Sequence, residues 1–474
     1  MTSSIVEASQ LKCIEEFNSN LQRNNNGLTE SRSAASTLFA KGDVGDDASD
    51  EVIADNSKSA VGKALTEHVN QIDHEECDAG DEDSFFVCDL NQVVKSVHTW
   101  RKHLPRIQPH YAIKCNTNIE VIKLLHQLGV SYDCASKNEI DTVLKLGIDA
   151  DKIVYANPCK TNSFIRHAKT SNVNLTTVDN AHELHKLARF HPECKILVRI
   201  MTDDEGAQCR LSTKFGCSLT TALESILPLA KRLGLPVVGV AFHVGSGAKD
   251  FESIYKAVRD SRAVFNRGIE MGFDMKMLDI GGGFEFETFV ESSKMVNVSI
   301  DEFFPKEFVD EHKIKFIAEP GRLMVANAFT LATHVIAKRE LQHDVADDEQ
   351  NRIKAMLYIN DGVYGNMNCI LFDHQHPTAH VLKNGSHFHY NHMERRLNND
   401  SNKEECKFEF NYSIWGPTCD GLDCVSTKSE LHFEVDVGDW LYFPNLGAYT
   451  SAAATQFNGF ENDTKIIYIP VESK

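Results

Sequence analysis

The chain has 474 residues and a formal net charge of -19 at pH 7. This acidity argues against a nucleic-acid-binding protein, which needs a basic surface, and is compatible with cationic small molecules or basic proteins as partners. Hydrophobic residues make up 42% of the chain and charged residues 25%, as in soluble globular proteins, and the length is sufficient for two domains.

The cysteines and the N-terminus indicate a reducing compartment. The 13 cysteines are an odd number, without a C-x-x-C pair or the tight spacing of a disulfide framework. Residues Met1–Gln22 lack a basic region followed by an apolar core, and no apolar run is long enough to span a bilayer. We therefore expect a cytoplasmic protein without a membrane segment.

Residues 1–83 are rich in Ser, Asn, Asp and Glu and contain charged stretches punctuated by glycine, which bury little surface. This composition predicts an N-terminal extension that is largely mobile. Within it, Val61–Ile72 has amphipathic spacing, which predicts a helix that docks on the folded part.

From Ile107 to Arg322 the sequence repeats one pattern, a short apolar run that ends in polar or glycine residues and in most cases precedes a helical stretch. The eight runs predict strands at His110–Lys114, Ser131–Ala135, Ile153–Ala156, Leu175–Val178, Lys195–Ile200, Val237–Val244, Met277–Ile280 and Lys315–Ala318. Helices are predicted at Ile119–Leu128, Asn138–Leu146, His182–Phe190, Leu219–Leu233, Phe251–Met271 and Ile300–Glu311. This alternation predicts an α/β fold with a (β/α)8 barrel of TIM type, whose chemistry collects at the C-terminal ends of the strands.

Beyond Ala326 strand-like runs between turns predict a second, all-β domain. The runs are Met356–Ile359, Phe408–Ile414, Leu431–Val435, Trp440–Phe443 and Lys465–Ile469. Phe85–Leu90 has the same character and is expected to join the sheet of this domain. The expected boundaries are 84–92 for the joining strand, 93–328 for the barrel and 329–474 for the β domain.

Polar residues and glycines fall at or near the ends of all eight predicted strands. They are Lys114, Asp133, Asn157, Asp179, Arg199, His243 with Gly245 and Gly247, Gly281–Gly283, and Glu319 with Arg322. A desolvated amine loses its proton readily, so Lys114 could hold an aldehyde cofactor as a Schiff base. The alternative is a strand lysine whose ammonium group reaches solvent.

The last two predicted strands end in groups suited to a phosphate and a ring nitrogen. Gly281–Gly283 allows backbone N–H groups to approach an anion and Arg322 adds a cation, although three glycines also occur in ordinary loops. Glu319 follows an apolar run. It either forms a salt bridge with an arginine or keeps a pyridinium nitrogen protonated, so that the ring accepts electrons from a breaking bond.

Two further features allow two interpretations each, and a third raises the question of a metal site. His243, next to two glycines, either stacks on a planar ring, with Ser246 reaching a phosphate, or is a core histidine. The loop Trp415–Asp423 either presents a thiol proton donor beside an amine-binding carboxylate or is an ordinary polar turn. The six histidines of Asp373–Met393 match no compact ligand motif, so no metal site is expected.

Six motifs together resemble the eukaryotic ornithine decarboxylase family, in particular its fungal branch, within the fold-type III pyridoxal-phosphate enzymes of the alanine-racemase-like barrel class. The resemblance covers residues 85–469 and rests on Tyr111–Asn116, His243–Gly247, Gly281–Phe284, Ala318–Arg322, Asn360–Tyr364 and Trp415–Asp420. It implies that pyridoxal 5'-phosphate is the cofactor, that L-ornithine is converted to putrescine and CO₂ for polyamine synthesis, and that the chain forms a homodimer. A decarboxylase of lysine, arginine or diaminopimelate and a non-catalytic protein similar to antizyme inhibitors are the alternatives.

The resemblance also implies residue roles. Lys114 would bind the cofactor aldehyde, His243 would stack on the ring, and Glu319 would pair with the ring nitrogen. Phosphate contacts are implied for Ser246, Gly281, Gly282, Gly283, Arg322 and Tyr449, and ring surroundings for Asp133, Glu139 and Arg199. Asp361 would bind the distal substrate amine, while Cys419, as proton donor, and Asp420 would come from the partner subunit. Family members bind a regulatory antizyme, which makes an antizyme a candidate partner.

Overall fold

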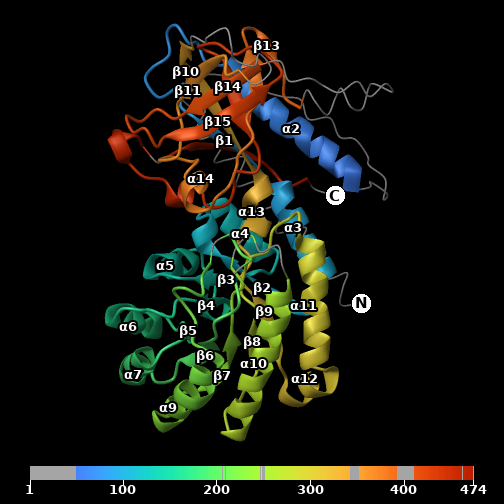
Figure 1. Cartoon of the computed structure of the whole chain (residues 1–474), viewed down its shortest axis with the longest axis vertical. Coiled ribbons are helices and arrows are strands. Elements are labelled where there is room, and N and C mark those ends of the chain that lie inside the picture. Colours follow the sequence, from blue (N-terminus) through green and yellow to red (C-terminus); the bar gives the residue numbers. More distant parts are fainter. Residues whose placement is uncertain are drawn as a thin grey trace. The chain divides into compact units, whose positions relative to one another are not determined.

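The computed structural model describes residues 50–204, 206–208, 210–245, 247, 251–341, 352–391, 410–461 and 463–472. The chain divides into two compact units (Figure 1). The barrel unit is Val94–Val325, and the sheet unit is the part up to Val93 together with the part from Ala326 onward. The expected mobile part of the N-terminus before Asp50 lies outside the described residues.

Eight parallel strands close the barrel, because the first of them pairs with the last. They are β2 (Ile107–Ala112), β3 (Ser131–Cys134), β4 (Ile153–Tyr155), β5 (Leu175–Val178), β6 (Lys195–Arg199), β7 (Val237–Ala241), β8 (Met277–Asp279) and β9 (Lys315–Ala318). Val154, Leu197, Ala241 and Ile317 pack together in the interior, so side chains fill the barrel as in other barrels of this type. The predicted (β/α)8 architecture is confirmed.

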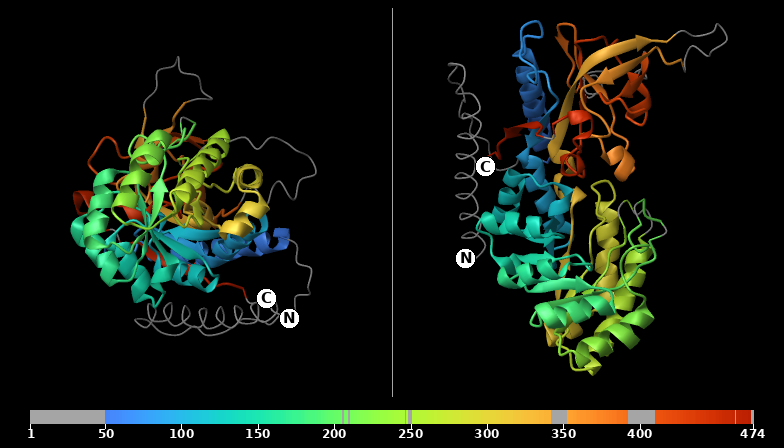
Figure 2. Two further views of the ribbon diagram at one scale, coloured as in Figure 1. Left: turned by 90° about the horizontal axis from the view of Figure 1, so that it is seen from below. Right: turned by 90° about the vertical axis from the view of Figure 1, so that its left-hand side faces the viewer.

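The helices of the barrel unit surround its strands (Figure 2). They are α3 (Leu90–His103), α4 (Ile119–Gln127), α5 (Lys137–Lys145), α6 (Asn162–Thr170), α7 (Ala181–Phe190), α8 (Leu219–Thr221) with the π-helix η3 (Ala222–Ile226) and α9 (Leu227–Arg232), α10 (Glu252–Glu270), α11 (Phe289–Phe303), α12 (Lys306–His312) and α13 (Arg322–Val325). Side chains of Asn118, Ser136, Thr161 and Asn180 accept backbone N–H groups at the starts of α4 to α7. These caps fix where each helix leaves its loop.

Several of the predicted barrel elements are wrong in detail; the strand predicted at Val237–Val244, for example, ends at Ala241. The strand predicted at His110–Lys114 ends at Ala112, and the 3-10 turn η1 (Ile113–Cys115) follows it. The helix predicted at Ile300–Glu311 is two helices, α11 and α12, because Pro305 stands between them and cannot donate the hydrogen bond that would continue a helix. Helix α6 had no sequence prediction.

The sheet unit contains a nine-stranded sheet. Its strands are β1 (Phe85–Asp89), β10 (Phe329–Glu340), β11 (Ala355–Ile359), β12 (His380–Asn384), β13 (His387–Phe388), β14 (Phe410–Trp415), β15 (Cys424–Leu431), β16 (Trp440–Phe443) and β17 (Lys465–Ile469), with a short helix α14 (Cys369–Phe372). The strand expected at Phe85–Leu90 joins this sheet, pairing with β10 and β17. The strand predicted at Leu431–Val435 is wrong, since the strand there, β15, ends at Leu431.

Helix α2 (Asp50–Asn70) packs on this sheet. Val61, Leu65 and Val69 recur every four residues, lie on one face, and are buried with Phe85 and Trp440. The predicted helix over Val61–Ile72 is therefore present, although it begins earlier and ends at Asn70. No helix in the described part of the chain is long and apolar enough to cross a membrane.

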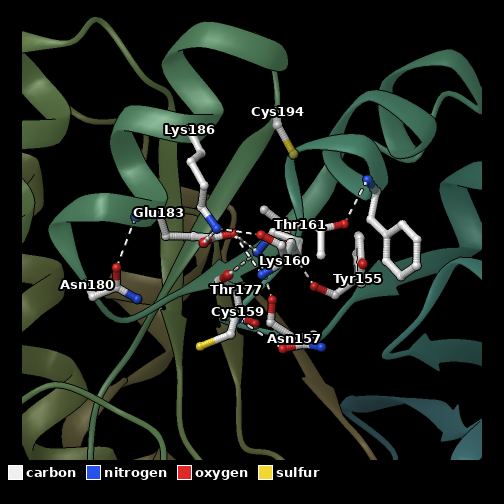
Figure 3. A network of polar contacts seen from close by, with 12 residues as sticks. Tyr155, Asn157, Cys159, Lys160, Thr161, Thr177, Asn180, Glu183, Lys186 and Cys194 are labelled. Carbon is white, nitrogen blue, oxygen red and sulfur yellow. Dashed lines mark hydrogen bonds and ion pairs between the residues drawn. The ribbon is translucent and has the colours of Figure 1, made fainter.

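A buried lysine ties the end of β4 to helix α7 in the barrel unit (Figure 3). The Lys160 side chain is 1% exposed and forms an ion pair with Glu183 of α7, with 3.0 Å between Nζ and Oε1. Its Nζ also donates to the carbonyl oxygens of Asn157 at 2.7 Å and Thr177 at 3.1 Å. Lys186 pairs with the same carboxylate. Both fully buried charges, those of Lys160 and Glu183, thus have a partner of opposite sign, as burial requires.

We predict that Lys160→Met lowers the free energy of unfolding by about 3 kcal/mol, because Glu183 is left in a buried position with only Lys186 beside it. Denaturant unfolding of both proteins measures the difference. The control is Lys306→Met, which removes an ion pair between side chains that are 80% and 62% exposed, and it should leave the free energy of unfolding nearly unchanged. Equal losses for the two variants would contradict a structural role for the Lys160 network.

Candidate active site

Lys114 stands on η1, immediately after the first barrel strand, and its ammonium group forms an ion pair with Asp133. Asp133 belongs to β3 and is fully buried, whereas the Lys114 side chain is 42% exposed. The neighbouring strands β2 and β3 pair in register at Ala112 and Asp133, which brings the two residues together. The ion pair fixes the amine at the C-terminal end of the strands, where a small molecule can reach it.

Two further carboxyl groups lie at the ends of β8 and β9. Asp279 is fully buried; its Oδ1 accepts the Gly281 N–H at 2.9 Å, and its Oδ2 has no hydrogen-bond partner among the described residues. Burial raises the pKa of Asp279 to about 7. Burial, followed by the charges of Asp279 and Asp133, raises the pKa of Glu319 well above its ordinary range. Sequence reasoning singled out Glu319 and missed Asp279.

This end of the barrel is therefore suited to a cation. Asp133 Oδ1, like Asp279 Oδ2, is buried without a hydrogen-bond partner in the described part of the chain. Buried carboxyl groups of this kind need a positive charge or a donor to offset their desolvation. A protonated ring nitrogen supplies both, so the residues present fit a pyridinium cofactor.

Gly281–Gly283 forms a surface without side chains next to these groups. Gly281 and Gly283 have φ values of +68° and +92°, which favour glycine. A Cβ on Gly281 would lie 2.2 Å from the Phe242 carbonyl oxygen, and a Cβ on Gly282 would lie 2.6 Å from the Glu319 carbonyl oxygen. The Glu319 N–H donates to the Gly281 carbonyl oxygen at 2.7 Å, which joins the glycine loop to the end of β9. All three positions require glycine on these grounds.

His243 is a neutral imidazole beside the glycine loop. Burial lowers its pKa to about 3, and the charges of Arg199 and Lys114 act in the same direction. Its Nδ1 accepts the Gly245 N–H at 3.0 Å, which leaves the proton on Nε2. The Thr202 hydroxyl donates to the His243 carbonyl oxygen at 2.8 Å. The ring orientation is thus fixed by its own backbone turn.

The remaining predicted residues of the barrel unit lie around this group. The Glu139 carboxylate accepts the Ala135 N–H at 2.6 Å, and burial raises its pKa. The charge of Arg199 acts on Asp279, Glu319 and His243. Arg322 begins α13 and forms an ion pair with Glu285 at 3.4 Å, which was not expected. Ser246 lies outside the described residues.

Asn157 and Asp179 shape loops at the strand ends. Asn157 accepts the Cys159 N–H at 2.9 Å and donates to the Ala135 carbonyl oxygen at 3.0 Å. Asp179 accepts the Gly216 N–H at 2.9 Å. Their side chains therefore make backbone contacts.

In the sheet unit, Asp361 faces a cavity of about 1070 Å³. Asp361 is 5% exposed, and its carboxylate accepts hydrogen bonds from the Ser84 hydroxyl, the Gly362 N–H, and the N–H and side-chain amide of Asn366. The acidic side chains Asp73, Glu76, Asp78, Asp81, Asp83, Asp361, Asp423, Glu461 and Asp463 line the cavity. This lining is suited to a cation with more than one amine.

The loop after β14 presents Cys419 and Asp420. Cys419 is exposed, and its N–H donates to the Asn458 side chain at 2.9 Å. The Tyr364 hydroxyl donates to Asp420 and lowers the pKa of that carboxyl group. Asp423, which sequence reasoning gave no role, is 1% exposed and accepts N–H groups from Val363 and Thr418. Asp423 therefore holds this loop to the Asn360–Tyr364 motif. Tyr449, expected at the phosphate, belongs to the sheet unit.

Comparisons with known proteins agree with this geometry. The family model described as "Pyridoxal-dependent decarboxylase, pyridoxal binding domain" matches residues 90–326. The ornithine decarboxylase of Candida albicans is 59% identical over 413 residues, covering 86% of this chain and 87% of that protein. Antizyme inhibitor 2 of Xenopus laevis is 43% identical over 404 residues, covering 84% of this chain and 82% of that protein.

A solved structure supports the fold. The Paramecium bursaria Chlorella virus arginine decarboxylase bound to agmatine has a TM-score of 0.73 and 31% identity, and the match covers 87% of this chain and 100% of that one. The chain belongs to the family of pyridoxal-dependent decarboxylases that includes the fungal ornithine decarboxylases. The resemblance found in the sequence and the expected pyridoxal cofactor are both confirmed.

We predict that Asp279→Asn stabilises the cofactor-free protein at pH 8. The folded-state pKa of about 7 exceeds the ordinary value of 3.8, so the folded state binds a proton that the unfolded state releases. Stability is therefore lost as pH rises between these two values. Asparagine carries no charge and still offers an acceptor to Gly281. The expected gain at pH 8 is roughly 1–4 kcal/mol.

Denaturant unfolding at pH 4 and pH 8 measures this effect, and the gain should shrink towards pH 4. Asp310→Asn, at a side chain that is 62% exposed, is the control and should show no such pH dependence. A variant that is less stable than the original protein at pH 8 would contradict the assignment of a strained buried charge to Asp279.

Proposed function

We infer that the protein is an ornithine decarboxylase, which converts L-ornithine to putrescine and CO₂ with pyridoxal 5'-phosphate as cofactor and thereby begins polyamine synthesis. The observation that carries this conclusion is the amine of Lys114 held by buried Asp133 at the end of a barrel that also carries Glu319. The identity of 59% to a fungal ornithine decarboxylase supports the choice of substrate.

The residues of the barrel unit would hold the cofactor by complementary charge and shape. Lys114 would bind the aldehyde carbon, Glu319 would accept the hydrogen of the ring nitrogen, and His243 would offer a neutral, flat face for stacking. Within the Gly281–Gly283 loop, the backbone N–H groups of Gly282 and Gly283 would bind the phosphate together with the guanidinium of Arg322, while the Gly281 N–H remains bonded to Asp279. When bound, the cofactor supplies an electron-accepting ring that stabilises the electron pair left at Cα as CO₂ departs.

Buried Asp133 holds the Lys114 amine in place and can exchange a proton with it. While the ion pair is intact, Lys114 is an ammonium group and not a nucleophile. A proton must therefore leave Nζ before the amine reacts, and the carboxylate of Asp133 is the acceptor in contact with it. Asp133 would also lower the cost of returning Lys114 to its charged form when the substrate amine takes its place.

The acidic cavity of the sheet unit supports a diamino acid as substrate. Asp361 would bind the distal ammonium group and Asp420 would face it. The four hydrogen bonds that Asp361 now accepts all come from neutral donors, of which Ser84 belongs to a distant segment. An arriving ammonium group would replace a neutral donor by a charged one, which forms the stronger hydrogen bond.

We propose that the active enzyme is a homodimer in which Cys419 and Asp420 serve the site of the partner subunit. Cys419 is exposed and lies on a loop that Asp423 holds in shape, so its thiol is available to a neighbouring chain. There it would donate the proton that Cα receives after CO₂ has left.

A cytoplasmic location is consistent with the free cysteines of the described residues. Antizyme is a candidate regulatory partner.

We predict that Lys114→Ala lowers CO₂ release from ornithine by at least about 10³-fold, because it removes the amine that would bind the aldehyde. The purified variant should also lack the absorbance near the visible edge that marks lysine-bound pyridoxal. The control is Lys137→Ala, at a lysine of α5 that is 40% exposed and pairs with Asp141, and it should retain activity. Normal turnover in Lys114→Ala would refute the assignment.

The same measurements separate the alternatives. A non-catalytic regulator would take up no cofactor and release no CO₂ from ornithine, lysine, arginine or diaminopimelate. Equal or greater turnover with lysine than with ornithine would make the protein a lysine decarboxylase.

We predict that co-expressing Lys114→Ala and Cys419→Ala chains restores activity that neither variant has alone. Random pairing makes half of the dimers mixed, and each mixed dimer has one intact site, so the expected recovery is about a quarter of the original activity. CO₂ release per chain measures it. For comparison, Lys114→Ala chains are co-expressed with Lys137→Ala chains. The Lys137→Ala chain keeps both Lys114 and Cys419, so this mixture contains a chain that is active without complementation. Activity of the first mixture no greater than that of the separate variants would show that Cys419 acts within its own chain.

A further inference from the structure

Two histidines and one glutamate from distant parts of the sequence meet in the sheet unit. His74 and Glu82 lie between α2 and β1, and His334 lies on β10. One ligand atom from each of the three side chains lies within 4.8 Å of the other two. His74 Nδ1 contacts Glu82 Oε1, and His334 Nδ1 lies 4.0 Å from the same oxygen. We call His74, Glu82 and His334 the His-Glu-His cluster.

His334 is the unusual member of the cluster, because its side chain is only 9% exposed. Its Nε2 is buried and has no hydrogen-bond partner among the residues that the structure describes, and its Nδ1 is beyond hydrogen-bond distance of Glu82. Buried imidazole nitrogens are normally satisfied, and leaving them unsatisfied costs free energy. A neutral imidazole with a free lone pair is the form that binds metal ions.

Contacts around the cluster hold two of its members in place. The Asn360 side chain accepts the backbone N–H of His334 at 2.8 Å and donates to the backbone carbonyl oxygen of Glu82 at 2.7 Å. The His334 ring stacks on Trp440, with 5.1 Å between ring centroids. Metal sites depend on such supporting contacts, which orient the ligands before the ion arrives.

We propose that the His-Glu-His cluster binds a divalent transition-metal ion, with Zn²⁺ as the preferred ion. Two imidazoles and one carboxylate are a known ligand set for Zn²⁺, with the fourth position left to water. Zinc ligands lie about 2.0–2.2 Å from the ion and hence about 3–3.5 Å from one another in a tetrahedral site. The cluster therefore needs to contract by little more than about 1 Å to bind the ion.

Binding requires a movement of His74. The rings of His74 and His334 are nearly parallel, with an interplanar angle of 25° and 4.9 Å between centroids. An ion that lies close to both ring planes needs a larger angle between them. His334 is buried against Trp440, whereas His74 is 26% exposed and lies on a loop. We therefore expect His74 to turn, giving up its 3.5 Å hydrogen bond from the Trp440 indole N–H.

The sequence alone could not indicate this site. His74 and Glu82 are separated from His334 by more than 250 positions (334 - 82 = 252), so the cluster matches no compact ligand motif. The expectation that the chain has no metal site was based on the six histidines of residues 373–393, which are different residues.

Titration of the metal-depleted full-length holoenzyme with Zn²⁺ by calorimetry tests the proposal. We expect one Zn²⁺ per chain at this site, and binding at least about tenfold weaker in His74→Asn and in Glu82→Gln. Both substitutions are at partly exposed residues of a loop, so folding should be retained. Co²⁺ provides a second readout, because its visible absorption reports coordination by nitrogen ligands and should be lost in the same variants.

The matched control is His387→Asn, at an exposed histidine of β13 in the histidine-rich segment. It should leave the Zn²⁺ affinity and the Co²⁺ spectrum unchanged. The proposal is overturned if the holoenzyme binds neither ion, if His74→Asn and Glu82→Gln bind as the original protein does, or if only His387→Asn loses the site.

Discussion

The ion pair between Lys114 and Asp133 is the interaction on which the arrangement of the candidate active site in the barrel unit depends. Asp133 is fully buried, and a buried carboxylate is tolerated only with a cation or with several donors. Lys114 supplies that cation while remaining 42% exposed. The amine is thus held by the protein on one side and open to a ligand on the other, as a covalent attachment point for a cofactor requires.

The other two carboxyl groups extend the same argument. Burial raises the pKa of both groups, and the negative charge of Asp279 raises the pKa of Glu319 further, since two negative charges in a buried site oppose one another. Without a cation, protonation is the cheapest way to relieve this repulsion, so the site is prepared for a protonated ring. Gly281–Gly283 and His243 then determine the shape of the site next to these carboxyl groups. The loop Gly281–Gly283 leaves no room for a Cβ, and the neutral imidazole adds no further charge.

The sequence predicted where the barrel strands end better than it predicted which side chains lie close together at those ends. Apolar runs followed by polar residues mark strand ends directly, which is why Lys114, Glu319 and Gly281–Gly283 could be placed before the structure was known. Asp279 was missed because it reads as the last residue of a strand, and only pairing of β8 with β9 shows its closeness to Glu319. The break at Pro305 had a visible signal, a proline within the predicted helix, that should have ended it.

Long-range hydrogen bonds account for the rest of what the sequence did not show. Ser84 donates to Asp361 at 2.8 Å and Glu82 is tied to Asn360 at 2.7 Å, although about 277 residues separate the segments. No local pattern reveals such pairs, since their residue types are common in loops. Their effect is that the segment before β1 supplies a donor to Asp361 and lines the acidic cavity. Composition alone describes this segment as part of a polar appendage, whereas Asp73, Glu76 and Ser84 line the cavity and Ser84 takes part in the hydrogen bonding of Asp361.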